Sequence, residues 1–297
     1  MINTQAASTG SKPLKVEKTS LFLETLQRML KGPGAKVGTT LFLLIILASI
    51  CAPLIAPYGP NDMDLKNMYA TPSAAHWLGT DGLGRDLLSR LLYGGRYSLA
   101  LGIFASVFGA FVGVFIGSIA GYFGGRTETL IMRLMDIWSS LPGMLLCILI
   151  SAVLGAGFFN TVLALSIGGV PESARYIRAQ ILKERSKEYL EAAEAINCSK
   201  FSIMFRHLLP NVIQPVLVFM TMGIGMVITM AAALSYIGLG VQPPTPEWGA
   251  LLSAGRLHIL NYPYLIMFPG LVIAVTVFAV NLMGDGLRDA LDPKLIS

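Results

Sequence analysis

This sequence lacks the common residue patterns of nucleotide-binding loops, serine nucleophiles and metal sites. No Gly-x4-Gly-Lys-Ser/Thr loop is present to hold nucleotide phosphates, and no serine lies in a Gly-x-Ser-x-Gly turn. The histidines His76, His207 and His258 are isolated, and the three cysteines form no Cys-x-x-Cys pair, so neither set has metal-site spacing. We therefore expect no catalytic site, no metal, no cofactor and no energy source within this chain.

The composition is that of a membrane protein. Of the 297 residues, 54% are hydrophobic and 13% are charged, which is about half the charged fraction of a soluble domain. So much apolar surface also excludes a disordered chain. In a membrane protein the net charge of +5 has meaning through the position of the charges, and it is not a sign of nucleic-acid binding.

Stretches without charged residues predict six membrane-spanning helices, since a spanning helix needs about 20 apolar residues. The stretches are 37–56, 97–122, 137–171, 208–246 and 259–284. The third is long for one helix, and the glycines of 155–157 indicate a turn in its middle, with another helix starting near Phe158. Two helices there place most Lys and Arg residues on the side of both termini, which the positive-inside rule makes cytoplasmic. We predict an all-α integral membrane protein.

The predicted organisation has five parts. They are a cytoplasmic N-terminal segment (1–36), a first spanning helix (37–56), an extracytoplasmic loop (57–96), a five-helix core (97–284) that includes a cytoplasmic elbow (175–210), and a cytoplasmic tail (285–297). The first segment is polar or amphipathic, so no signal peptide is expected. Its apolar residues near Phe22 and Leu26 fit a short interfacial helix, and a plain basic leader fits equally well.

Two features are expected near the extracytoplasmic side. A stripe of leucines over 83–92, with Asp81–Arg85 and Asp86–Arg90 at ion-pair spacing, predicts a short helix lying on the membrane surface. Trp248 is expected to be an interfacial anchor.

The second span carries a stripe of small residues. The glycines are Gly109, Gly113, Gly117 and Gly121. A spacing of four places them on one face, where they favour close packing of another helix, and a subunit interface is the alternative.

The fifth span combines methionines with small hydroxyl residues. They are Thr221, Met222, Met226, Thr229 and Met230. Flexible thioethers suit a translocation path that tolerates varied solutes, although ordinary helix packing explains them as well.

The elbow predicts two helices joined by a turn. Strong helix formers run from 174 to 196, Asn197 tolerates the left-handed conformation that ends a helix, and Ser199 can cap a second helix. Pro210 is expected to end that second helix. Its apolar side is formed by Phe201, Phe205, Leu208 and Leu209. Such a face usually marks a partner site, the alternative being a loop packed on the chain's own helices.

Four segments, taken together, resemble one family. Glu191-Ala192-Ala193, Asn197 and the following Leu-Pro resemble the "EAA" loop of ABC-importer membrane subunits, in which a glycine usually stands where this chain has Asn197. The segments 79–86, 242–249 and 284–294 narrow the resemblance to the second permease of dipeptide, oligopeptide and nickel importers.

The resemblance implies a type I importer fold and a non-catalytic permease in a prokaryotic cell membrane. The implied partners are a second homologous permease, two cytoplasmic ATPase subunits that bind ATP, and an extracytoplasmic solute-binding protein. In that family the elbow docks into a groove on the ATPase. The implied coupling residues are Glu191, Ala192, Ala193, Asn197, Phe201, Phe205, Leu208 and Leu209. Peptides are the expected cargo, with nickel chelates or other small solutes as alternatives. A self-sufficient carrier or channel fits poorly, because the spans contain no charged residue.

Overall fold

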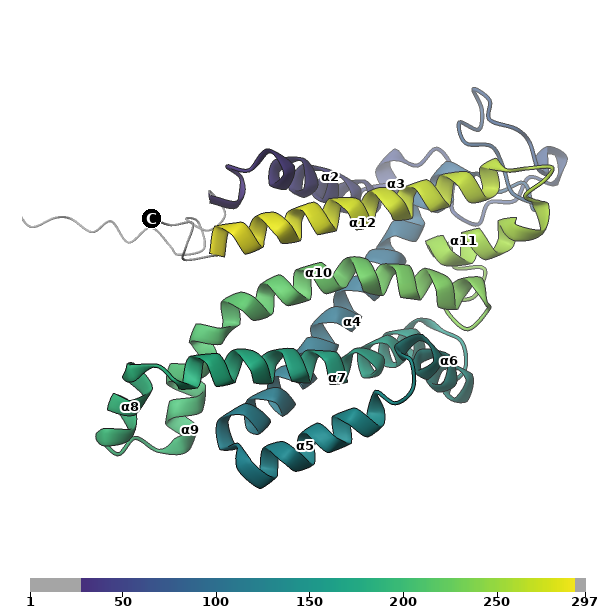
Figure 1. Ribbon diagram of the computed structural model, residues 1–297. Helices are drawn as coiled ribbons and strands as arrows, with labels where there is room; N and C mark the ends of the chain where they lie inside the picture. The colour runs from purple at the N-terminus through teal and green to yellow at the C-terminus, as the bar shows by residue number, and fades with distance from the viewer. Residues whose placement is uncertain (1–27, 292–297) are drawn as a thin grey trace, which may run out of the picture.

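Helices form almost all regular structure in residues 28–291, the part of the chain that the computed structural model describes (Figure 1). The longer helices are α2 (Pro33–Ile50), α4 (Leu87–Phe123), α5 (Gly125–Trp138), α6 (Gly143–Leu154), α7 (Phe158–Arg185), α10 (Leu209–Tyr236) and α12 (Tyr264–Leu291). The shorter ones include α3 (Ala52–Ile55), α8 (Glu188–Ala195), α9 (Lys200–Ser202) and α11 (Trp248–Gly255). Helices satisfy their own backbone hydrogen bonds, which lipid requires. The predicted all-α class is confirmed.

Within residues 28–291, four helical segments are long and apolar enough to cross a membrane. They are α2, α4, Lys200–Tyr236 (which contains α10) and α12. Helices α5 and α6 make a fifth candidate, bent by 76° at the break between them. The fourth predicted span falls on α7, whose second half carries several charged residues. The number six and the cytoplasmic position of both termini therefore remain predictions.

The turn predicted between the third and fourth spans is confirmed. Helix α6 ends at Leu154 and α7 begins at Phe158. Gly155 and Gly157 between them have φ angles of 84° and 149°, which glycine adopts without steric cost.

The short surface helix predicted over 83–92 is wrong, because α4 begins at Leu87 and continues without a break into the second span. Asp86 caps this early start by accepting a hydrogen bond from the Ser89 N–H at 2.8 Å. The helix continues through Gly94. A glycine is needed there because the Pro246 carbonyl oxygen occupies the space that a side chain would fill.

Helix α4 crosses behind α10 and α7 in Figure 1 and makes its most extensive contact with α7. The contact brings backbone close to backbone because the four glycines of the predicted stripe face α7. They are Gly109, Gly113, Gly117 and Gly121, and all are buried. A Cβ atom on Gly117 would lie 2.5 Å from the Ala174 carbonyl oxygen. The stripe thus packs inside this chain rather than on its surface.

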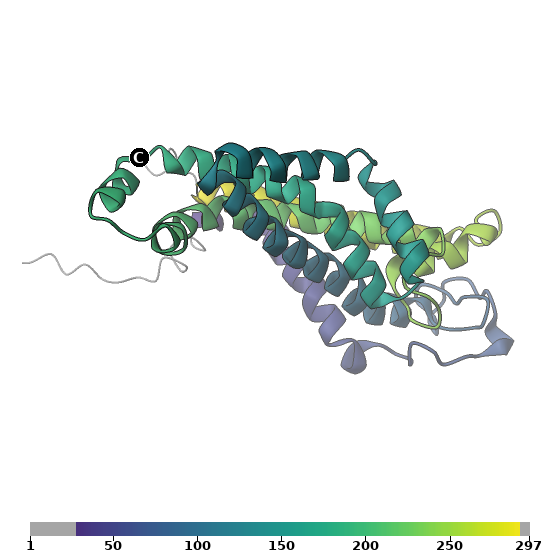
Figure 2. The ribbon, with the colours of Figure 1, turned by 90° about the horizontal axis from the view of Figure 1, so that it is seen from below.

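The non-spanning segments gather at the two ends of the bundle (Figures 1 and 2). Residues 56–86, here called the capping loop, lie with α11 at one end, and α8 and α9 lie at the other. The start of α2 and the end of α12 meet at the α8 end, where Met29 and Ala35 pack against Ala290.

Candidate functional site

The elbow turns at Asn197. This residue follows α8 and has a φ of 56°, the left-handed conformation predicted for it. The Ser199 hydroxyl then accepts a hydrogen bond from the Ser202 N–H at 3.2 Å and caps α9, also as predicted. Local residue preferences therefore define the corner of the elbow.

The second arm of the elbow does not end at Pro210, and that prediction is wrong. Helix α9 passes through a π-helical segment, Ile203–Leu208, directly into α10. Leu209 is helical, with φ −58° and ψ −43°, and Pro210 lies in the first turn of α10. The π-helical turn changes the hydrogen-bond spacing just before the proline, where a regular helix would be disrupted by its ring. The arm is therefore continuous with the long helix α10.

The predicted apolar face of this arm divides into an exposed and a buried part. Phe201 is 67% exposed and Phe205 is 51% exposed, with nearly parallel rings whose centroids are 6.4 Å apart. Leu208 is fully buried and Leu209 is partly buried, both in a cluster with residues of α7. Including Leu208 in the exposed face was wrong, because the π-helical segment turns it toward α7. Ile196, 77% exposed, was not anticipated, although an apolar residue just before the Asn197 turn is a usable signal.

The first arm divides in the same way. Glu191 and Ala192 are exposed, whereas Ala193 is 6% exposed and belongs to the same cluster as Leu190. One face of α8 thus fixes the elbow to the bundle and the other stays open.

A polar network joins the base of the elbow to the long helices. The Tyr189 hydroxyl donates to Oε1 of Glu184 at 2.8 Å, and Nδ2 of Asn211 donates to the Tyr189 oxygen at 3.0 Å. Asn211 also donates to the His207 carbonyl at 2.7 Å, and Lys187 lies 2.8 Å from Glu184. Burial, followed by the Glu184 carboxylate, raises the pKa of Tyr189 to about 12, so the bridging hydroxyl stays protonated. The network connects α7, α8 and α10, and the sequence analysis did not find it.

The methionine face of α10 is only partly open. Met222 is 39% exposed and Met226 is 66% exposed, but Met230 packs into a cluster with residues of α4 and α6. The Thr221 and Thr229 hydroxyls donate to carbonyls one turn earlier in their own helix, at 2.8 and 3.0 Å. The open part therefore presents methyl and thioether groups rather than free donors.

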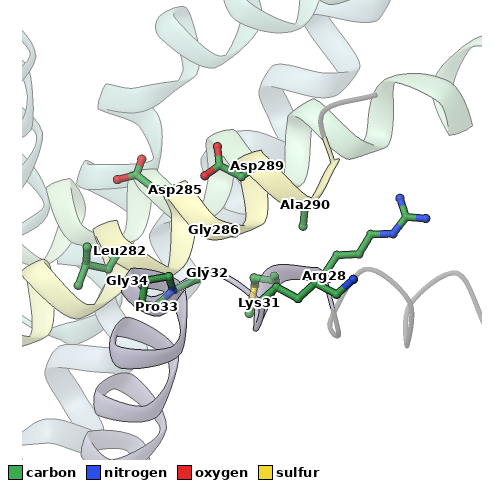
Figure 3. A pocket seen from close by; sticks show the side chains of 12 residues that line it. Arg28, Lys31, Gly32, Pro33, Gly34, Leu282, Asp285, Gly286, Asp289 and Ala290 are labelled. Atoms are coloured by element: carbon green, nitrogen blue, oxygen red, sulfur yellow. The ribbon is translucent and has the colours of Figure 1, made fainter. Parts of the chain in front are cut away.

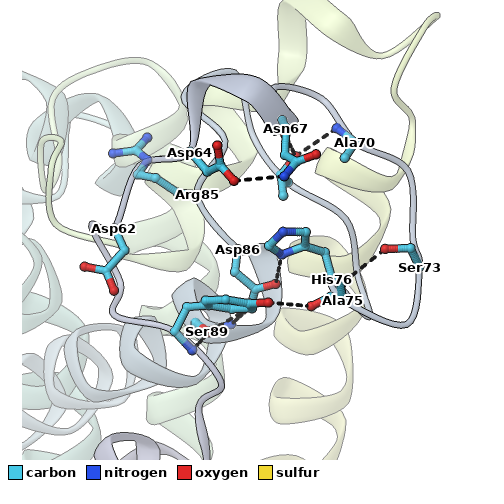
Figure 4. A network of polar contacts seen from close by, with 12 residues as sticks. Asp62, Asp64, Asn67, Ala70, Ser73, Ala75, His76, Arg85, Asp86 and Ser89 are labelled. Atoms are coloured by element: carbon cyan, nitrogen blue, oxygen red, sulfur yellow. Dashed lines mark hydrogen bonds and ion pairs between the residues drawn. The ribbon is translucent and has the colours of Figure 1, made fainter.

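At the opposite end, Asp86 organises the capping loop (Figure 4). Its carboxylate accepts from the Ser89 N–H and hydroxyl at 2.8 and 2.7 Å, and His76 Nδ1 lies 3.0 Å away. Asp86 is 2% exposed and His76 is 8% exposed. The loop is thus closed onto the start of α4 by a buried carboxylate with several partners.

One of the two ion pairs predicted in this region is present. Nε of Arg85 lies 2.8 Å from Asp81, as expected. Arg90 does not pair with Asp86; it donates to the Pro60 carbonyl at 2.8 Å and lies 3.6 Å from Asp81. The prediction failed because Asp86 is already committed to capping α4 and to His76.

Trp248 is a core residue, so its assignment as an interfacial anchor is wrong. It is 1% exposed, and its ring N–H donates to the Leu91 carbonyl at 2.9 Å. Glu247 beside it is equally buried and accepts hydrogen bonds from the Ser98 hydroxyl at 3.0 Å and from the first N–H groups of α11. Burial raises the pKa of Glu247, while these hydrogen bonds act against the increase. The sequence signal that was missed is a helix-capping Glu directly before α11.

A bundle of long apolar helices with an exposed aromatic elbow at one end places the chain in the class of helical membrane proteins. Residues 113–297 match the model of the family described as "Binding-protein-dependent transport system inner membrane component". Residues 20–72 match the "N-terminal TM domain of oligopeptide transport permease C". The chain belongs to the first of these families, and it is a multi-pass inner-membrane permease of the ABC-importer type.

Similar proteins include permeases of glutathione transport systems. The chain is 43% identical over 275 residues to the glutathione transport system permease protein GsiD of Pectobacterium atrosepticum, covering 92% of this chain and 91% of that protein. It is 45% identical over 273 residues to GsiD of Escherichia coli O6:K15:H31, covering 92% and 90%. The resemblance to the peptide-importer permeases is confirmed.

Solved structures support the fold. A chain of the MetNI methionine ABC transporter in an inward-facing conformation superposes with a TM-score of 0.59 at 17% sequence identity, covering 69% of this chain and 98% of that chain. A second crystal form gives a TM-score of 0.58. The type I importer fold predicted from the sequence is therefore confirmed.

Proposed function

We propose that this chain is the permease subunit of an ATP-driven importer that carries small peptides of the glutathione class into the cytoplasm. The observation that carries the proposal is 43–45% identity to glutathione transport permeases over 92% of the chain. Identity of this extent supports a shared architecture and a related cargo. The chain itself is non-catalytic in this proposal, and partner ATPase subunits bind and hydrolyse ATP.

Energy enters through the elbow, which we place in the cytoplasm. Phe201 and Phe205 offer an exposed aromatic face for a groove on one ATPase partner. Because α9 continues into α10 through the π-helical segment, a push on these rings moves α10 directly. The Tyr189 network passes the same displacement to α7. Two ATPase subunits and a second homologous permease complete the transporter, and its spans alternate between two states.

Cargo passes a permissive surface in this scheme. The exposed part of the α10 face, Met222 and Met226, offers flexible apolar groups. Strong discrimination needs polar groups that the wrong ligand leaves unpaired, and the Thr221 and Thr229 hydroxyls are already bonded within α10. Selection of the peptide therefore belongs mainly to an extracytoplasmic solute-binding protein.

The test is uptake of labelled glutathione by the reconstituted complex, with unlabelled dipeptides, longer peptides and nickel chelates as competitors. We expect ATP-dependent uptake that glutathione and short peptides inhibit. The purified chain alone should hydrolyse no ATP. Uptake of a nickel chelate with no inhibition by any peptide would refute the proposed cargo, and ATP hydrolysis by the isolated chain would refute the non-catalytic role.

A further inference from the structure

Two cavities lie at the elbow end of the bundle, and their charges differ. The first, about 540 Å³, lies between α12 and the residues before α2 (Figure 3). It is lined by two basic residues, Arg28 and Lys31, and two acidic ones, Asp285 and Asp289, so it has no formal net charge. The second, about 370 Å³, lies between α7, α10 and α12. Its lining has three basic residues, Lys183, Lys187 and Arg288, and one carboxylate.

Among residues 28–291, one carboxylate lines the second cavity against three basic side chains. Lys187 pairs with the one carboxylate, Glu184, at 2.8 Å. The side chains of Lys183 and Arg288 make no hydrogen bond or ion pair with a residue that the structure describes. Two uncompensated cations on the wall of one cavity favour the binding of an anion, most strongly one with several acceptor oxygens.

The charges of the lining are confined to its elbow side. Lys183, Glu184, Lys187 and Arg288 lie there, and farther along α7 and α10 the lining is uncharged and ends in Tyr176, Pro215 and Val218. A charged group at the elbow side would thus have apolar surface on its membrane side. This order matches a phospholipid, whose phosphate lies at the membrane boundary above its acyl chains.

We propose that this cavity binds the phosphate headgroup of an anionic phospholipid from the cytoplasmic leaflet. Lys183 and Arg288 contact the phosphate, and the apolar part of the lining holds the start of an acyl chain. With the elbow in the cytoplasm, as proposed above, the cavity lies at the level of that leaflet's headgroups. A free phosphate ion shares the charge but has no use for the apolar lining. A bound lipid would brace α7 against α12 next to the Tyr189 network.

The experiment measures retention of labelled phosphatidylglycerol by the purified chain in phosphatidylcholine nanodiscs, using native mass spectrometry. The test variant is Lys183→Gln with Arg288→Gln. The control is Arg126→Gln with Arg133→Gln, which removes two exposed charges from α5, outside the cavity. Each basic residue near anionic lipid changes affinity about fivefold, so we expect about 25-fold weaker binding for the test variant and little change for the control.

A second variant, Lys183→Arg with Arg288→Lys, keeps the charge and should retain the lipid, which separates loss of binding from misfolding. Unchanged retention by the Gln variant would overturn the proposal. Equal losses in the cavity and control variants would also overturn it, since they would show attraction by overall charge. Displacement of the lipid by millimolar inorganic phosphate would assign the cavity to a soluble anion and reject the lipid.

Discussion

The capping loop and the elbow lie at opposite ends of the same bundle and are built in opposite ways. The capping loop turns its polar groups inward: Asp86 is 2% exposed and bonds Ser89 and His76, while the Tyr264 hydroxyl donates to the carbonyls of Ala70 and Thr80 at 3.1 and 3.0 Å. The elbow has such a network only at its base and leaves Phe201 and Phe205 exposed.

We interpret this difference as one between a fixed element and a moving one. A loop whose buried polar groups are satisfied within the chain has a single favourable arrangement, because any displacement leaves donors unpaired. An elbow attached at its base, with an uncovered aromatic face, gains further stability when a partner covers that face. We therefore interpret the capping loop as a static cover and the elbow as the part through which force enters.

The largest expected effect is at the exposed aromatic face. Phe205→Asp should lower ATP-driven uptake by more than about a hundredfold while the protein still inserts, because burying an unpaired charge in a docking groove costs several kcal/mol. Phe205→Leu is the matched control and should keep most of the uptake. Substrate uptake and the amount of assembled complex are the measurements. Normal uptake by Phe205→Asp would mean that the elbow does not dock through this face.

The second effect concerns the stability of the capping loop. Asp86→Ala removes a helix cap and leaves the buried donors of Ser89 and His76 without an acceptor, so we expect a loss of about 2–4 kcal/mol in unfolding free energy. Asp86→Asn should lose less, since Asn also caps helices. Thermal unfolding and proteolysis of the loop measure this. Asp62→Ala, at an exposed position, is the control; an equal change in both variants would contradict the assigned role of Asp86.

A smaller effect is expected at the base of the elbow. Tyr189→Phe removes the hydroxyl between Glu184 and Asn211. Glu184 keeps its ion pair with Lys187, and Asn211 keeps its hydrogen bond to the His207 carbonyl. A loss of about 1 kcal/mol should reduce uptake per ATP hydrolysed by about fivefold. Tyr97→Phe is the control, because no hydrogen bond of its hydroxyl is present among the described residues. Unchanged coupling in Tyr189→Phe would leave the network a purely structural role.

The smallest effect is expected between the two ends, on the face of α10. Met226→Leu keeps volume and apolar character, so uptake should change less than about twofold and the order of competing peptides should not change. Exchange of the solute-binding protein should alter that order. Competition uptake with each binding protein measures both effects. Selectivity that followed the permease instead would require a specific cavity within the spans.

Local residue preferences were enough to predict several features of the fold. The glycines between α6 and α7, the left-handed turn at Asn197 and the Ser199 cap follow from conformations that few residue types adopt at low cost. Long charge-free stretches predicted the spanning helices, since lipid excludes charge wherever they lie in the chain. The segment around Glu191, together with 79–86, 242–249 and 284–294, added the family, because four such segments in this order are highly specific.

Pairing and burial were decided by the tertiary structure. Arg90 has Asp86 at helical spacing, yet His76 from the capping loop occupies that carboxylate. Trp248 has the character of an interfacial residue, but its segment folds back onto α4 and buries it. In each case the outcome depended on a segment distant in sequence, which spacing along one helix cannot represent.

The sequence by itself determined that this chain is a helical membrane protein with an elbow, because composition, charge position and turn residues act locally; the resemblance of four segments to one family added that it is a permease. Only the tertiary structure decided that the elbow continues into α10 past Pro210, that Leu208 faces α7, and that Tyr189 bridges α7 to α10. The physical reason is that packing selects among locally allowed conformations. A π-helical turn next to a proline becomes favourable where it buries Leu208, and a tyrosine hydroxyl has partners only where three helices meet.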